Sequence, residues 1–217
     1  ISKADFPLVL KLRSGAGSRN VRLIKDQKTA KRLIRKSFGR GIRQYNAFGG
    51  LVESLRKYRM GKASLKTVIK SIAHFIYPIQ LEKSEGRHKG YIYFQEFIPG
   101  CKYDIRIQSV GDKMWAMTRM VRKGDFRASG SGKLNYDPKM IPEEALRLSM
   151  EISKKLNLQS MAIDLLPFKN GFLIAEISYA FGVDPEELEV GYWDKNLHWH
   201  PGKINPFAWM DDIVRRL

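Results

Sequence analysis

Two acidic residues, Asp164 and Glu176, lie on apolar segments that a short turn, Lys169-Asn170-Gly171, connects. Side chains alternate between the two faces of a strand, and directly opposed residues on paired strands share a face. A three-residue loop with Gly171 in a left-handed conformation sets Asp164 opposite Glu176, whereas a two-residue Asn170-Gly171 loop turns the carboxylates to opposite faces. We predict the three-residue loop, and therefore two carboxylates side by side.

Such a pair of carboxylates is suited to metal binding. Adjacent carboxylates repel each other, and a bound divalent cation relieves that repulsion. Ser178, two residues after Glu176, lies on the same face and supplies a third oxygen. We therefore predict a metal site of Asp164, Glu176 and Ser178. The alternative is that both acids are solvated residues on an outer face, which for two acids taken alone is the more common situation.

A glycine-rich segment follows an apolar run near the start of the chain. Residues 6–12 predict a strand that ends in Ser14-Gly15-Ala16-Gly17-Ser18. Backbone amides of such a loop approach phosphate oxygens closely, and Lys11 adds a point charge. A surface hairpin also carries glycines of this kind, so the loop taken alone does not identify a site.

The charge of the chain is unevenly distributed. The 217 residues have a formal net charge of +17, and 14 Lys and Arg residues lie between Lys25 and Lys70 against Asp26 and Glu53. This segment predicts a surface for an anionic partner, and a nucleic-acid-binding module is one function class that it allows. Helices carry the same residues on a solvated face, and no recognisable nucleic-acid-binding motif accompanies them. An acidic acceptor or anionic lipid headgroups are further candidates.

The cysteine content and the hydropathy limit the setting. Cys101 is the one cysteine in the sequence, which excludes an intrachain disulfide and indicates a reducing compartment. No signal peptide is evident, and no apolar run approaches the roughly 18 residues that a membrane-spanning helix needs. We therefore expect a cytoplasmic protein. Because the chain begins at Ile1 and enters a strand within a few residues, we expect that an upstream segment is missing.

Hydrophobic spacing and turn signals predict the elements that position these residues. Asp26 is the expected N-cap of the first helix and Gly39 its stop. Helices are predicted near 28–37, 50–59, 65–75, 142–156 and 207–217. Strands are predicted at 6–12, 21–25, 91–98, 103–110, 114–121, 161–168 and 171–178. The three strands between 91 and 121 are expected to form one antiparallel sheet.

In this order along the chain, the features resemble the ATP-grasp superfamily and, within it, the RimK-like carboxylate-amine ligases. The resemblance covers 6–25 and 91–178, about half of the chain. It implies an α+β fold in which two lobes with mainly antiparallel sheets clasp ATP. The smaller lobe would be 1–98 with a basic helical insertion at about 26–78, and the larger lobe 99–217. An N-terminal domain would precede Ile1.

The same resemblance assigns the residues that contact ATP. The strand lysine and the mobile glycine loop would bind the phosphates, namely Lys11, Gly15, Gly17 and Ser18. The backbone at Glu96, Phe97 and Ile98 would read the adenine edge. Asp104 would bind the ribose hydroxyls.

Arginines and metal ligands complete the resemblance. Arg119 and Arg127 fall where the family places phosphate-side or substrate-side arginines. Asp164 and Glu176 match the magnesium carboxylates, with Glu176 bridging two ions. Ser178 replaces the asparagine usual in the family, which leaves open a degenerate domain that binds nucleotide without catalysis.

The resemblance implies a reaction with ATP and Mg²⁺. A carboxylate would take the terminal phosphate of ATP to form an acyl phosphate, and an amine or other nucleophile would displace the phosphate. Positioning and charge neutralisation supply most of the catalysis in such a transfer. A looser resemblance of 125–132 and 193–200 to ATP-grasp proteins of bacterial surface-polysaccharide synthesis suggests that setting.

Two histidines and two tryptophans near the C-terminus have two interpretations. His198 and His200, with Trp193 and Trp199, would line an acceptor pocket, or the tryptophans pack the lobe and the histidines lie at its edge. Zinc binding by the two histidines is disfavoured, because no third ligand is close in the sequence.

Overall fold

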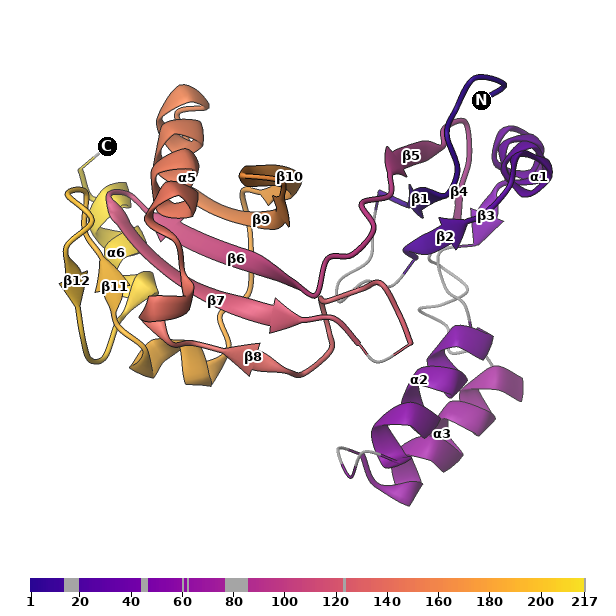
Figure 1. Cartoon of the computed structure of the whole chain (residues 1–217). Coiled ribbons are helices and arrows are strands. Elements are labelled where there is room, and N and C mark those ends of the chain that lie inside the picture. Colours follow the sequence, from indigo (N-terminus) through magenta and orange to yellow (C-terminus); the bar gives the residue numbers. More distant parts are fainter. Residues whose placement is uncertain are drawn as a thin grey trace. The chain divides into compact units, whose positions relative to one another are not determined.

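The computed structural model describes residues 1–13, 20–43, 47–59, 61, 63–76, 86–122 and 124–216. Figure 1 shows the course of the chain. The chain divides into two units, Ile1–Phe97 and Ile98–Leu217. The predicted phosphate loop, with Gly15, Gly17 and Ser18, lies outside the described residues. None of the described helices is long and apolar enough to cross a lipid bilayer.

The first unit is built on a three-stranded antiparallel sheet in the order β2-β1-β5 (Figure 1). Its strands are β1 (Leu8–Lys11), β2 (Arg22–Ile24) and β5 (Tyr93–Glu96). Helix α1 (Gln27–Phe38) packs against the sheet, because its Ala30 and Leu33 share one buried cluster with sheet residues. The buried members of the cluster are Leu10, Ile24, Ala30 and Leu33, all of them apolar.

Both ends of α1 follow from local sequence signals. Asp26 Oδ1 accepts a hydrogen bond from the Thr29 backbone N–H at 2.8 Å, and Gly39 donates its N–H to a carbonyl of the last turn at 2.9 Å. The fully buried Ser37 donates from Oγ to the Tyr91 carbonyl, which ties the helix to the segment before β5. The predicted cap and stop of this helix are confirmed.

Helices α2 (Ala47–Arg59) and α3 (Leu65–Ile76) also belong to the first unit and pack against each other. They confirm the helices predicted at 50–59 and 65–75. Strands β3 (Ile42–Arg43) and β4 (Arg87–His88) precede and follow them in the sequence and pair with each other. These two strands were not predicted, because two residues leave no periodic signal.

The second unit contains a seven-stranded antiparallel sheet in the order β10-β9-β6-β7-β11-β12, with β8 paired to β7 (Figure 1). The long strands are β6 (Tyr103–Val110), β7 (Lys113–Met120), β9 (Ser160–Phe168) and β10 (Gly171–Ser178). The short strands are β8 (Leu134–Asn135), β11 (Tyr192–Trp193) and β12 (Trp199–His200). The unit also contains the 3-10 helices η1 (Pro138–Met140) and η2 (Pro185–Glu189) and the helices α5 (Glu143–Lys155) and α6 (Pro206–Val214).

The prediction that 91–98 joins 103–121 in one sheet is wrong. Strand β5 pairs with β1 in the first unit, over four residue pairs from Lys11 opposite Tyr93 to Leu8 opposite Glu96. Gly100 lies between β5 and β6 with φ 81°, a conformation that breaks an extended chain. The segment after β5 is therefore a link between two sheets and not a hairpin turn.

The two faces of the larger sheet differ because side chains alternate along its strands. One face carries Ile105 and Ile163, which pack with α5 (Glu143–Lys155) around its Ala145 and Leu146. The helix predicted at 142–156 is confirmed: Pro142 is the N-cap of α5, and glutamates lie in its first turn and lysines in its last, as the helix dipole favours. The opposite face has an apolar part with Val110 and Trp115 and a charged part with Asp104, Arg106, Arg119 and Asp164, which we call its two halves.

The C-terminal segment covers the apolar half of the opposite face. It includes α6 (Pro206–Val214), whose Trp209 packs with Trp115 at a ring distance of 6.0 Å. Glu187 of η2, which is 3% exposed, accepts a hydrogen bond from Trp115 Nε1 at 2.9 Å, and burial raises the pKa of Glu187. Gln108 donates to the Gly182 carbonyl at 3.3 Å. These bonds fix the segment after β10 to the sheet beside its charged half.

Gly191, directly before β11, gives a test of this packing. Its φ is 90°, and an added Cβ would lie 2.5 Å from the His200 carbonyl oxygen. We expect Gly191→Ala to lower the free energy of unfolding by more than about 2 kcal/mol. The strain of a side chain in a left-handed backbone conformation and the overlap of its Cβ with the carbonyl oxygen both contribute. Gly202→Ala is the matched control, with φ 108° and nothing within 4 Å of an added Cβ, and about 1–2 kcal/mol is expected there. Urea unfolding measures both, and equal losses would contradict the overlap at Gly191.

Candidate functional site

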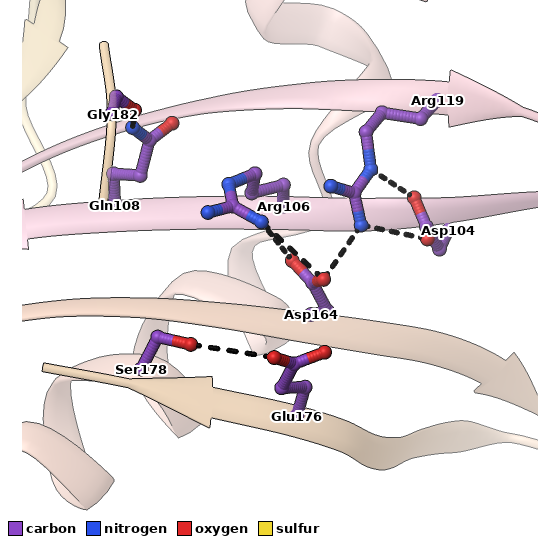
Figure 2. Close-up of polar contacts among 8 residues, drawn as sticks. All are labelled: Asp104, Arg106, Gln108, Arg119, Asp164, Glu176, Ser178 and Gly182. Carbon is purple, nitrogen blue, oxygen red and sulfur yellow. Dashed lines mark hydrogen bonds and ion pairs between the residues drawn. The ribbon is translucent and has the colours of Figure 1, made fainter. Parts of the chain in front are cut away.

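Charged side chains gather where β6, β7, β9 and β10 lie side by side (Figure 2). Strand register sets Asp104 opposite Arg119, Arg106 opposite Asp164, and Asp164 opposite Glu176. Directly opposed residues share a face, so all five point to the face that α5 does not cover. We call these five residues the charged cluster.

The predicted pairing of Asp164 with Glu176 is confirmed, but the predicted loop is wrong. The turn between β9 and β10 has two residues, and Lys169 rather than Gly171 adopts the left-handed conformation, with φ 51°. That turn alone would set Asp164 opposite Ala175. A β-bulge at Ala175 shifts the register by one residue and returns Glu176 to the position opposite Asp164.

Two arginines join the carboxylates of the charged cluster. Arg119 donates from Nε to Asp104 Oδ1 at 2.7 Å and from Nη2 to Asp104 Oδ2 at 2.8 Å. The same Nη2 lies 2.8 Å from Asp164 Oδ2. Arg106 donates from Nη1 to the two oxygens of Asp164 at 3.1 and 3.4 Å. Figure 2 shows Asp164 held between the two guanidinium groups.

The centre of the charged cluster is buried. Arg119 is 5% exposed, Asp104 7% and Asp164 8%. Burial raises the pKa of Asp104 above its ordinary value, although Arg119 opposes that rise. Burial disfavours the charge of Arg119, but Asp104 and Asp164 outweigh this effect and raise the pKa of Arg119. Arg119 therefore stays charged and is fixed between two carboxylates.

The contacts of Asp104 favour a positioning role. Both of its oxygens accept charge-assisted hydrogen bonds from Arg119. A ribose hydroxyl would have to replace one of these strong bonds in a buried place. The ribose contact expected from the sequence is therefore not the role that these contacts favour.

Arg106 is a site residue that the sequence interpretation missed. It contacts Asp164 and lies two residues after Asp104 in the sequence. The signal was present, because residues two apart on a strand share a face, so Asp104 and Arg106 point the same way. What the sequence lacked was the pairing of β6 with β9.

Glu176 and Ser178 form the exposed end of the site. Ser178 Oγ donates to Glu176 Oε1 at 3.5 Å, and Glu176 is exposed while Ser178 is half-buried. In the described part of the chain, no group of three or more His, Cys, Asp or Glu side chains is arranged to hold a metal. Mg²⁺ usually keeps several waters and binds one or two carboxylates together with substrate phosphates. Glu176 and Ser178 present oxygens to such an ion, whereas both oxygens of Asp164 accept hydrogen bonds from Arg106 and one also contacts Arg119, so the metal site stays a prediction.

Comparison with known proteins gives the family. The RimK-like ATP-grasp domain matches residues 78–192, which is more than half of the chain and contains the whole charged cluster. This chain belongs to the RimK-like ATP-grasp family. The mixed α+β architecture, with mainly antiparallel sheets, is that of an ATP-grasp domain, as the sequence predicted.

A curated relative matches part of the chain. It is a probable alpha-L-glutamate ligase of Vibrio parahaemolyticus serotype O3:K6 (strain RIMD 2210633), 32% identical over 109 residues. The matched region is 48% of this ATP-grasp chain and 35% of the relative. The chain thus spans about a third of the length of that protein.

The other expected nucleotide contacts lie on the first unit of the ATP-grasp chain and at its end. Lys11 is the last residue of β1 and is half-buried opposite Tyr93. Glu96 is the last residue of β5. Phe97 ends the first unit and Ile98 begins the second, so the expected adenine-binding segment coincides with the boundary between units along the chain.

Arg127 is held by its own loop. Its Nε donates to the two oxygens of Asp125 at 2.9 and 3.0 Å, and its backbone N–H donates to the same carboxylate at 3.2 Å. Although burial opposes the charge of Asp125, these bonds lower the pKa of that carboxyl. The role of Arg127 toward the substrate stays a prediction.

The C-terminal histidines share one carboxylate. His200 Nε2 lies 3.0 Å and His198 Nδ1 lies 3.6 Å from Asp194 Oδ2, with 45% and 74% of the two histidine side chains exposed. Trp193 and Trp199 pack together at a ring distance of 4.4 Å, with Trp193 in the core beneath α5. These positions agree with the interpretation that the tryptophans pack the unit and the histidines lie at its edge.

The Asp194 cluster predicts a pKa change. The hydrogen bond from His200 is the largest cause that lowers the pKa of Asp194 to about 2, and backbone N–H groups add to it. We expect His200→Ala to return this pKa toward about 3.9. Because the folded-state pKa is lowered, the stabilisation is present above about pH 4 and is lost as the pH falls toward 2. Carboxyl NMR titration measures the change, and an unaltered pKa would show that the backbone bonds suffice.

Proposed function

We propose that this chain binds magnesium ATP and is the nucleotide-binding part of a ligase that joins a carboxylate to an amine. The observation that carries the proposal is the pairing of the buried Asp164 with the exposed Glu176 on the face that α5 does not cover, beside Arg106 and Arg119. Membership in the RimK-like ATP-grasp family and the ligase name of the relative support it.

The acidic and the basic residues of the site would have different roles. Asp164, Glu176 and Ser178 would hold Mg²⁺, which when bound neutralises charge on the phosphates of ATP. Arg106 and Arg119 present fixed positive charge next to that position. A preorganised cation stabilises negative charge that develops during phosphoryl transfer without having to move.

Asp104 would act as a positioning residue for Arg119. It accepts hydrogen bonds from Arg119 through two oxygens, which would fix the orientation of the guanidinium. The remaining contacts with ATP would come from Lys11 at the phosphates and from the backbone of 96–98 at the adenine. Arg127 would contact the carboxylate substrate or the transferred phosphate.

The reaction would run in two transfers. A carboxylate oxygen of the substrate attacks the terminal phosphorus of ATP, and ADP leaves. The nitrogen of an amine then attacks the acyl carbon of the acyl phosphate, phosphate leaves, and the nitrogen loses a proton to give the amide. The name of the relative makes glutamate the first substrate to test, as the carboxylate or as the amine. The setting in surface-polysaccharide synthesis stays a prediction.

Trapping of the acyl phosphate tests the proposal. The chain is incubated with ATP, Mg²⁺, hydroxylamine and a panel of carboxylates that includes glutamate, other amino acids and short peptides, and ADP and hydroxamate are measured together. We expect both products with the unaltered chain and neither with Glu176→Gln. Binding of magnesium ATP without ADP formation, with glutamate and a panel of other amino acids and short peptides, would instead support the nucleotide-binding domain without catalysis that Ser178 suggests.

A further inference from the structure

The helix pair α2 and α3 has a small interior. Val68 of α3 is 4% exposed and Ser54 of α2 is 7% exposed, and both lie among the residues that the two helices bury. The pair is an insertion in the first unit between β3 and β4. Nothing in the charged cluster explains why this insertion is present.

The same helices expose an apolar stripe. Leu65, Ile69 and Ile72 of α3 are 55%, 57% and 43% exposed, and their spacing of four and three residues sets them on one face of the helix. On α2, Val52, Leu55 and Tyr58 are 49%, 38% and 44% exposed. Single exposed apolar residues are ordinary, but a stripe of this kind indicates that something covers it.

The helix pair is also strongly basic. Its 47–76 segment contains six Lys and Arg residues and one acid, Glu53. Lys66 and Lys70 directly follow Leu65 and Ile69 and are exposed. Long lysine stems extend along an apolar surface while their charges reach beyond it.

The first unit adds more positive charge. Burial and the nearby charges of Arg40, Arg22, Arg87 and Arg32 lower the pKa of Lys36, so cations from α1, β2 and β4 repel one another. An anionic surface relieves such repulsion. A second copy of the chain would bring its own Lys66 and Lys70 to a contact through α3, so like charges would meet there and this partner is disfavoured.

A partner that binds the exposed face of α2 and α3 must therefore offer both apolar groups and negative charge. Nucleic acid supplies the charge, but it meets protein through phosphates and through stacking on aromatic rings, and of the six exposed apolar side chains named above Tyr58 alone is aromatic. The interface of an anionic bilayer supplies both: acyl chains for Leu65, Ile69 and Ile72, and headgroups for the lysines. We propose that α2 and α3 bind an anionic membrane surface, with the apolar stripe of α3 inserted at the level of the headgroups.

Vesicle sedimentation of the whole chain tests this inference. Vesicles of phosphatidylcholine are compared with vesicles that contain about a third phosphatidylserine. We expect binding to the anionic vesicles that weakens with added salt, and at least about tenfold weaker binding for Leu65→Ser, Ile69→Ser and Ile72→Ser combined. Lys66→Glu with Lys70→Glu is expected to remove the preference for anionic vesicles.

A matched control distinguishes binding through this surface from nonspecific hydrophobic binding to vesicles. Met140, Leu156 and Phe207 of the second unit are 47%, 51% and 60% exposed, and changing all three to serine is expected to leave vesicle binding unchanged. Circular dichroism and magnesium ATP affinity report whether each variant is folded. Absence of vesicle binding by the unaltered chain would overturn the inference. So would equal binding to neutral vesicles, or a dimer in solution that the α3 substitutions abolish without any vesicle binding.

Discussion

Replacing Arg119 by methionine is expected to lower the free energy of unfolding by about 3–5 kcal/mol. Arg119 is 5% exposed and donates to both Asp104 and Asp164. Its removal leaves Asp104 buried without the guanidinium that both of its oxygens contact. A buried carboxylate without its partner is far more costly than the loss of the pair as a whole.

A surface ion pair provides the control for Arg119. Arg147 pairs with Glu143 one helical turn away on α5, with 63% and 60% of the two side chains exposed. Arg147→Met is expected to change stability by less than about 1 kcal/mol, because solvent screens exposed pairs. Adding Asp104→Asn to Arg119→Met is expected to recover part of the loss, since the two residues are coupled. Equal losses for the Arg119 and Arg147 variants in urea unfolding would contradict a buried, coupled cluster.

Replacing Glu176 by glutamine is expected to weaken magnesium-dependent ATP binding by about 10- to 100-fold while leaving stability unchanged. Glu176 is exposed and contacts Ser178 at 3.5 Å, so the amide keeps the size and the hydrogen bond of the side chain. What the variant loses is the negative charge that a hard cation requires.

Glu151→Gln on α5 is the matched control for Glu176, because it removes one exposed carboxylate away from the charged cluster. It is expected to leave ATP affinity unaltered. Equal weakening by the two substitutions in calorimetric titrations would show that total charge, and not a metal site, governs binding.

Local signals predicted the ends of helices well. Asp26 and Gly39 act within one helical turn, and the charges at the ends of α5 act over a similar range. The long strands β6, β7 and β9 also followed from their composition. Strands of two residues were not predicted, because they are defined by pairing with a distant segment and not by their own sequence.

The candidate site was predicted in part. The pairing of Asp164 with Glu176 was right, but it was reached through a loop that the structure does not have. A two-residue turn and the bulge at Ala175 give the same result, because two shifts of one residue cancel. A bulge at an alanine has no recognisable sequence signal. The contact of Arg106 with Asp164 depends on the order of the strands in the sheet, which composition does not give.

Calorimetric titration of ATP into the chain, with magnesium and with magnesium removed by a chelator, tests whether a metal is bound together with the nucleotide. We expect saturable binding with one nucleotide per chain when magnesium is present, and much weaker binding when it is absent. ATP affinity that is the same with and without magnesium would contradict the assignment of Asp164 and Glu176 as ligands of a nucleotide-bound metal.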